Sequence, residues 1–306
     1  MFLTVCLNPT IQKTIVLDTL RIDDVNRSPE HYLDISGKGI NVSRVLVQLG
    51  EPVIHVTHAG GALKHFFLKR ARREGLALKT ASTRTPIRIC VTLLQKQDGT
   101  TTEIVEDGPA VDAATEGKVR KNLYALIPRS RAVILSGSKA AGYSDALFPD
   151  TVRRARKAGK LVVCDYRGRD LIDSLACGPD IIKPNLTEFI ETFFPACDRL
   201  ARDPGILTMV EEKMRLLWHE HHGMCVLTDG GGPVLFCDHG HPRRLDPPRL
   251  HPVNTTGCGD AFTAGLTRAF LLSRNLEESV KAGVRCAVRN ALTVRPGFMK
   301  EEPAGS

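Results

Sequence analysis

The stretches that decide the fold class are RAVILSGS (131–138), YSDALFPDTVRRARKAG (143–159) and KLVVCDY (160–166), which follow one another along the chain. The first and third are short runs of branched aliphatic residues, which are typical of strands buried on both faces. The middle stretch has apolar residues at helical spacing and ends at Gly159, as helices often do. This order predicts two parallel strands joined by a right-handed helical crossover.

The same alternation recurs further along the chain. DIIKPN (180–185) and MCVLTDGGG (224–232) are predicted as buried strands, and ILTMVEEKMRLLWHEHHG (206–223) as a helix that ends at glycine. The expected fold class is therefore α/β, with a mostly parallel sheet covered by helices.

Two segments, 11–34 and 84–108, break this alternation. Polar and apolar residues alternate in them, for example in PIRICVTLLQ (86–95), which is followed by the turn QDGT (97–100). Such strands expose one face. We expect a small sheet that projects from the main one, with a free face that covers a ligand cleft or pairs with a second subunit.

Composition limits the function classes. The 306 residues are 42% hydrophobic and 25% charged, with a net charge of +8 that suits phosphorylated metabolites or nucleic acid. The basic residues are not interleaved with aromatic ones and form no nucleic-acid-binding motif, so nucleic acid is not expected as a partner. Nine cysteines without a CxxC pair argue against disulfides or a zinc knuckle. With no signal-peptide pattern and no membrane-spanning apolar run, a cytoplasmic location without membrane contact is expected.

The segment SGKGINVSRVLVQLG (36–50) carries the first candidate chemistry. Gly37 and Gly39 allow close approach of the backbone to a ligand, Lys38 supplies a charge, and Asn41 both donates and accepts hydrogen bonds. The alternative is a glycine turn before a packing helix. Neither GxxxxGK[ST] nor GxGxxG is present, so neither of these common nucleotide loops is expected.

The second candidate is VNTTGCGDAFTAGLTRAFLL (253–272), a glycine-containing turn that leads into an apolar helix beginning near Asp260. Consecutive amides at a helix N-terminus form an anion site. An ionised Asp260 there can accept a proton from a substrate hydroxyl, while the amides of Gly257, Cys258 and Gly259 hold developing phosphoryl charge. Asp260 as a simple helix cap is the alternative; the neighbouring glycines, which a cap does not need, favour chemistry.

Taken together, these two segments resemble the signatures of the PfkB (ribokinase-like) carbohydrate kinases. The chain further resembles the branch with 1-phosphofructokinase and tagatose-6-phosphate kinase. The segments that carry this resemblance are LTVCLNPTIQKTIVLD (3–18), VNR (25–27), TRTPIRI (83–89), TEIVEDGP (102–109), LSGS (135–138) and KPNLTE (183–188). The resemblance implies a single domain over 1–306, a doubly wound sheet with a β lid from about 11–34 and 84–108, ATP as the donor, Mg²⁺, and a phosphorylated ketohexose as acceptor.

The resemblance also implies residue roles. Asp260 is the expected catalytic base, with Gly257, Cys258 and Gly259 as its anion hole. The expected nucleotide-binding residues are Lys183, Asn185, Glu188, Thr228 and Gly230, with Glu188 acting on magnesium indirectly. The expected acceptor-binding residues are Gln12, Gly37, Lys38, Asn41 and Ser138, with Arg27 and Arg88 as phosphate clamps.

The chain departs from the family pattern at two acceptor positions. Gln12 replaces an aspartate that grips sugar hydroxyls, and Ser36 replaces a glycine. A kinase of an unphosphorylated sugar or nucleoside, and a catalytically weakened regulatory protein of the same fold, therefore stay open. Convergence of Arg27, Lys38 and Arg88 on one end of a pocket would favour a phosphorylated acceptor. A homodimer through the lid sheet is a further expectation.

Overall fold

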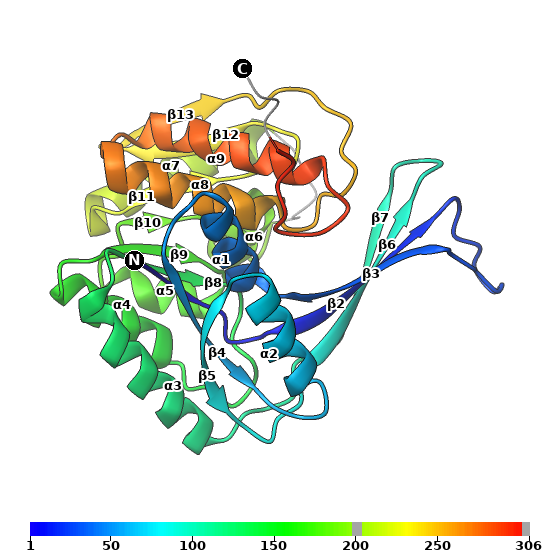
Figure 1. The fold of residues 1–306 in the computed structure, drawn as a ribbon. Helices are drawn as coiled ribbons and strands as arrows, with labels where there is room; N and C mark the ends of the chain where they lie inside the picture. Colours follow the sequence, from blue (N-terminus) through cyan, green and yellow to red (C-terminus); the bar gives the residue numbers. More distant parts are fainter. Residues whose placement is uncertain (198–203, 302–306) are drawn as a thin grey trace.

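A computed structural model describes residues 1–197 and 204–301 of the chain (Figure 1). Its main sheet has the strand order β13-β12-β11-β10-β9-β8-β1-β4-β5. The strands are β1 Phe2–Val5, β4 Val53–Ala59, β5 Ala77–Ser82, β8 Ala132–Ser136, β9 Leu161–Asp165, β10 Ile181–Ile182, β11 Met224–Leu227, β12 Val234–Asp238 and β13 His241–Leu245.

All neighbouring strands from β5 to β11 pair in parallel, and the β11–β12 and β12–β13 pairs are antiparallel. From β1 the chain builds outward through β4 and β5, and then resumes on the other side of β1 with β8. This reversal makes the sheet doubly wound, and ligands of such sheets bind beyond the carboxyl ends of the strands at the reversal. The predicted α/β class is confirmed.

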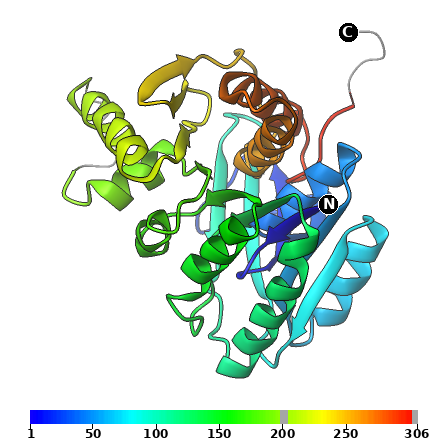
Figure 2. The same ribbon diagram turned by 90° about the vertical axis from the view of Figure 1, so that its left-hand side faces the viewer.

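Helices cover both faces of the sheet. The helices are α1 Lys38–Gln48, α2 Lys64–Arg73, α3 Ala113–Leu126, α4 Leu147–Lys157, α5 Arg169–Leu175, α6 Leu186–Phe193, α7 Pro204–His221, α8 Cys258–Ser273 and α9 Leu276–Ala291, with a 3₁₀ turn at Ile127–Arg129. Apolar residues of α1, α8 and α9 form one core cluster, and those of α3 to α7 form another. Figures 1 and 2 show α8 and α9 on the side of the sheet opposite α3 and α4.

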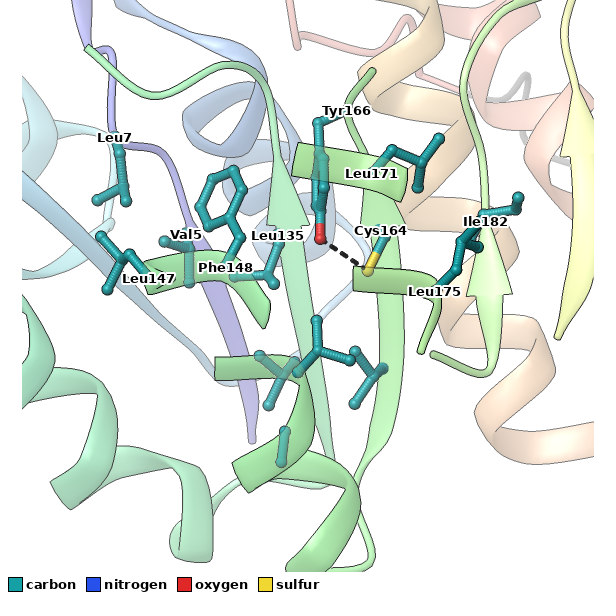
Figure 3. Packing of buried hydrophobic residues seen from close by; sticks show 14 of the residues in the cluster. Val5, Leu7, Leu135, Leu147, Phe148, Cys164, Tyr166, Leu171, Leu175 and Ile182 are labelled. Carbon is teal, nitrogen blue, oxygen red and sulfur yellow. Dashed lines mark hydrogen bonds between the residues drawn. The ribbon is translucent and has the colours of Figure 1, made fainter. Parts of the chain in front are cut away.

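The core beneath the α3–α7 face reaches the carboxyl ends of the central strands (Figure 3). Tyr166, directly after β9, stacks on Phe148 of α4 with ring centroids 4.6 Å apart. Its hydroxyl lies 2.7 Å from Ser174 Oγ and 3.3 Å from Cys164 Sγ, so its polar end is satisfied within the core. This packing fixes the end of β9, where the next residue toward the N-terminus is Asp165.

A second sheet of order β3-β2-β6-β7 projects from the main body (Figure 1). It consists of β2 Thr10–Leu17, β3 Glu30–Ser36, β6 Arg88–Gln95 and β7 Thr101–Val105. The β2–β6 pair is parallel and the two outer pairs are antiparallel. A small projecting sheet is therefore confirmed.

Some predicted features differ in extent. Residues 18–29 form no strand, and β10 has only two residues within 180–185. The strand β2 is buried along most of its length, not half-exposed, because it lies between β3 and β6 and its Ile11 packs in a cluster with Ile35 and Ile40. The helix of the second signature segment, α8, begins at Cys258, two residues before Asp260.

Within the described residues, no helix has the length and apolar character needed to cross a membrane.

The buried His55 of β4 predicts a pH dependence of stability. Its Nδ1 lies 2.8 Å from Thr4 Oγ1 and 3.1 Å from Ser43 Oγ, and burial lowers its pKa from 6.5 to about 3. The unfolded chain takes up a proton at this residue below pH 6.5 while the folded chain does not, so stability falls as pH drops through that value. Between pH 7.5 and 5.5, His55 should account for about 1.4 kcal/mol of lost unfolding free energy.

The measurement is urea unfolding of the wild type and of His55→Leu at both pH values. The variant should lose less stability on acidification than the wild type, because leucine takes up no proton in the unfolded chain. The hydroxyls of Thr4 and Ser43 lie 2.6 Å apart and can keep each other as hydrogen-bond partners. Equal losses in the two proteins would contradict this assignment.

Candidate active site

A cavity of about 1010 Å³ lies at the carboxyl edge of the main sheet, next to the lid. It is lined by residues from the two signature segments, from the ends of β9, β10 and β11, and from lid strands β2, β6 and β7. The predicted site residues that line it are Gln12, Gly37, Lys38, Asn41, Arg88, Lys183, Asn185, Glu188, Thr228, Gly230, Gly257, Cys258, Gly259 and Asp260. Segments separated by more than 200 positions thus meet in one cleft at the reversal of the sheet.

The first turn of α8, at its N-terminus, faces this cavity. Gly257 caps the helix with a φ of 86°, a left-handed conformation that favours glycine, and an added Cβ would lie 2.9 Å from Gly297 N. The Cys258 amide donates to Thr255 O at 3.2 Å, so it is partly engaged in the turn. The amides of Gly257 and Gly259 make no hydrogen bond within the described chain. Two of the three predicted anion-hole amides are therefore available to a ligand.

Asp260 is a buried carboxylate in that first turn, with 6% of its surface exposed. Its Oδ2 accepts a hydrogen bond of 2.8 Å from Asn41 Nδ2 of α1. Burial and the charge of nearby Asp165 raise the pKa of Asp260 to about 7, although Lys38, the Asn41 amide and Lys183 each lower it. A carboxylate with this pKa exchanges its proton near neutral pH, as a general base requires.

Asp165 at the end of β9 is the centre of a charge cluster. Its Oδ2 accepts hydrogen bonds from Ser136 and Thr263 at 3.1 and 2.8 Å. Its buried Oδ1 has no hydrogen bond but lies 3.5 Å from Lys183 Nζ and 3.7 Å from Lys38 Nζ. Burial opposes ionisation, but the two lysines and two hydroxyls outweigh it and lower the pKa of Asp165. Asp165 is therefore a fixed negative charge inside the site.

Lys38 joins this cluster to α6. Its Nζ lies 2.9 Å from Glu188 Oε1, and the carboxylates of Asp165 and Glu188 raise its pKa although burial alone would lower it. Glu188 is itself oriented by a capping box, in which its Oε2 accepts from Asn185 N at 3.0 Å and Asn185 Oδ1 accepts from Glu188 N at 2.7 Å. The sequence N-x-x-E at 185–188 thus aims a carboxylate at the cavity.

The carboxylates of Asp165 and Glu188 fit a magnesium ion that enters with nucleotide phosphates. Both lie within 4 Å of Lys38 Nζ, and Asp165 Oδ1 is a buried acceptor without a donor. Among the described residues no group of three or more His, Cys, Asp or Glu is placed to hold a metal. Mg²⁺ in phosphoryl-transfer sites needs only one or two carboxylates together with phosphate oxygens and water, so the residue set suits that ion.

The lid contributes polar side chains from its inner face. Gln12 of β2 is 5% exposed, and its Nε2 donates to Thr92 Oγ1 of β6 at 2.7 Å. Arg88 at the start of β6 donates through Nη1 to Glu106 O at 2.8 Å, while its buried Nε has no partner. Glu103 of β7 accepts a 2.9 Å hydrogen bond from Thr256 in the loop before α8. The lid therefore contacts the segment that carries the predicted anion-hole residues.

Two predicted acceptor residues lie outside the cavity lining. Arg27 is exposed in the loop between β2 and β3, away from Lys38 and Arg88, which both line the cavity. Ser138 follows β8, where its Oγ accepts a 3.3 Å hydrogen bond from Asn8 Nδ2. The three cations named as a test of a phosphorylated acceptor thus converge only in part within one chain.

Sequence reasoning missed Asp165, Ser136 and Thr263. The first two are the last residues of buried strands β9 and β8, and the carboxyl ends of such strands are where ligands of doubly wound sheets bind. That position in the pattern was the available signal for Asp165. Thr263 carries no local signal, because its role arises only when α8 packs beside β9.

Comparison with known proteins agrees with this geometry. Residues 10–300 match the family model described as pfkB family carbohydrate kinase. A possible 1-phosphofructokinase from Thermotoga maritima has a TM-score of 0.86 at 21% identity, covering 98% of this chain and 94% of its own.

Two more distant structures extend the comparison. The tetrameric inhibited form of phosphofructokinase-2 from Escherichia coli gives a TM-score of 0.83 at 20% identity, covering 95% of this chain and 94% of its own. A ribokinase from Thermotoga maritima gives 0.71 at 16% identity, covering 97% and 94%. At these identities the structural likeness establishes the shared fold.

Proposed function

The chain belongs to the pfkB family of carbohydrate kinases, and from this we propose that it transfers the γ-phosphoryl group of ATP, with Mg²⁺, to a hydroxyl of a phosphorylated ketohexose. The observation that carries the proposal is Asp260, a buried carboxylate with a pKa of about 7 beside free amides at the start of α8. A base next to an anion hole matches what in-line phosphoryl transfer requires.

In this mechanism the ionised Asp260 accepts the proton of the acceptor hydroxyl as its oxygen bonds to phosphorus and the bond to the ADP oxygen breaks. The amides of Gly257 and Gly259 donate to the oxygens of the moving phosphoryl group. Lys38 and Lys183 offset the charge of Asp165 and of the phosphates. Asp165 and Glu188 would hold Mg²⁺, which would supply positive charge against that of the phosphates.

A phosphorylated acceptor is favoured by Arg88. It lines the cavity from the lid, and its buried Nε lacks a partner. A guanidinium with an unused N–H suits a phosphate oxygen, because planar N–H groups bind phosphate strongly and with defined geometry. Lys38 lines the same cavity. Asp260 lines this cavity too.

The test is ATP consumption by the purified protein with fructose 1-phosphate, fructose 6-phosphate, tagatose 6-phosphate, fructose, ribose and adenosine. We expect turnover on a phosphorylated ketose and a loss of at least about 10²-fold in Asp260→Asn with nucleotide binding retained. Because Asp260 must be ionised, kcat/KM should rise about tenfold per pH unit in acid and level off near pH 7. We call this rising part of the profile the acid limb.

Turnover of only fructose, ribose or adenosine would replace the phosphorylated acceptor with a neutral one. ATP binding without turnover of any acceptor would favour a regulatory protein. A near-normal rate in Asp260→Asn would exclude Asp260 as the base.

Gln12→Asp should tighten acceptor binding. A carboxylate at this position accepts charge-assisted hydrogen bonds from sugar hydroxyls, which are about twice as strong as neutral ones, so a gain of about 1 kcal/mol or roughly fivefold in KM is expected. Gln12→Asn is the matched control, because it has the length of aspartate without its charge. Equal acceptor KM values for the two variants would show that the acceptor does not contact this side chain.

We also propose that two copies of the chain pair through the outer face of the lid. Leu33 of β3 and Ile104 of β7 are 41% and 57% exposed. Register aligns Leu33 with Lys13, Lys13 with Val91 and Val91 with Ile104, so these four residues form one row across that face. A second copy would remove the exposed apolar side chains from water.

Light scattering after size exclusion measures this assembly. We expect the wild type to be dimeric or larger and the double variant Leu33→Asp/Ile104→Lys to be monomeric, with unchanged thermal stability of the monomer fold. The matched control is Ile172→Asp, an exposed apolar residue of α5 outside the lid. A monomeric wild type would reject the pairing.

A further inference from the structure

Arg44, in the middle of α1, is a buried charge that no step above uses. Its side chain is 2% exposed, and its guanidinium makes four hydrogen bonds and an ion pair. Nε and Nη2 bind Glu74 Oε2 at 2.9 and 2.8 Å, and Nη2 also donates to Ile35 O at 2.7 Å. Nη1 donates to Pro296 O at 3.0 Å and to Asn41 Oδ1 at 2.8 Å. A guanidinium bound this completely has one orientation.

The contact with Asn41 decides which way its amide faces. Arginine has no acceptor atom, so only the amide oxygen of Asn41 can face it. Ser36 Oγ, 4% exposed, donates to the same oxygen at 3.2 Å. The amide nitrogen is therefore directed to the other side, where it donates to Asp260 Oδ2 at 2.8 Å. The reversed amide would present its oxygen to the carboxylate and its nitrogen to a guanidinium.

We propose that Arg44 is a positioning residue for phosphoryl transfer, which holds the Asn41 amide in the orientation that donates to the ionised form of Asp260. The inference rests on the proposed function, in which Asp260 is the base. Arg44 does not itself line the cavity, and its link to the site is the hydrogen bond to Asn41, which does. It acts through one side chain, across one turn of α1.

Other charged and titratable groups that influence Asp260 come from separate elements. They are Lys38 from α1, Asp165 from β9, Lys183 after β10, Cys6 after β1 and Cys258 from α8 itself. The charged groups with the largest influence on Arg44 are Glu74, Asp34 and Arg295, which form a different set. Replacing Arg44 therefore leaves the charged neighbours of Asp260 in place.

The experiment is a double-mutant cycle in which the pH dependence of kcat/KM is measured for each variant. Without Arg44 the Asn41 amide can reverse, which favours the protonated form of Asp260. In Arg44→Met the acid limb of kcat/KM should move up by about one pH unit, with the rate recovering at higher pH and the KM for ATP unchanged. In the Asn41→Ala background, Arg44→Met should cause no further shift. An unmoved limb, or a full shift that persists without Asn41, would overturn the proposal.

Glu74→Gln is the matched control, because it disturbs the same buried ion pairs but leaves the contact of Arg44 with Asn41 in place. It should lower thermal stability without moving the limb. If Arg44→Met does not fold, Ser36→Ala removes the second donor to the Asn41 oxygen and should shift the limb by a smaller amount in the same direction. No shift in Ser36→Ala would then count against the mechanism.

A readout without substrate separates this inference from the proposed function. The side-chain carboxyl ¹³C resonance of Asp260, identified by its absence in Asp260→Asn, reports protonation directly. A higher titration midpoint in Arg44→Met supports the inference even if no acceptor is turned over. An unchanged midpoint rejects it even if the protein is an active kinase.

Discussion

The neutralisation of Asp165 is the interaction on which the site depends. A carboxylate that is 1% exposed at the end of a central strand is strongly unfavourable without partners. Four segments supply these partners: Lys38 from the start of α1, Lys183 after β10, Ser136 from β8 and Thr263 from α8. Satisfying this one charge brings the two signature segments and the strand ends into register around the cavity.

The same cluster sets the state of the second buried carboxylate. Asp165 raises the pKa of Asp260, while the lysines that neutralise Asp165 lower it. Two acidic groups in one enclosed site are thereby assigned different roles, one permanently ionised and one able to exchange a proton near neutral pH. Environment, more than residue type, separates them.

Much of the fold could be predicted from local patterns. The aliphatic runs ending at Ser136 and Asp165 and the helical spacing of 143–159 are signals contained within about twenty residues. Asp260 was identified for the same reason, because glycines and an acidic residue at a helix start are adjacent in sequence. The predicted acceptor residues Gln12 and Arg88 follow from a family resemblance, and both line the cavity.

What could not be predicted depends on contacts between distant positions. Lys38 and Glu188 are separated by 150 positions, and Asn41 and Asp260 by 219. From the sequence, Arg44 is expected to be an exposed arginine of an amphipathic helix. In the structure it is surrounded by Glu74, Ile35 O and Pro296 O. No periodicity within α1 distinguishes such a residue from a solvated one. The location of Arg27 outside the cavity is likewise a matter of how far the loop after β2 extends, which its sequence does not specify.

The hydrogen bond between Glu103 of β7 and Thr256 has a consequence for the order of events. It joins the lid to the loop that ends at the Gly257 cap, so the lid cannot lift without releasing a side chain of that loop. Entry to the inner face of the lid and the resting geometry of the phosphoryl site are thus mechanically connected. Lifting the lid to admit a ligand would break this bond, and lowering it would restore the bond. Such a connection would bear on one side reaction, the hydrolysis of ATP by water when no sugar is bound. Whether this reaction is suppressed would depend on whether ATP or the sugar enters first.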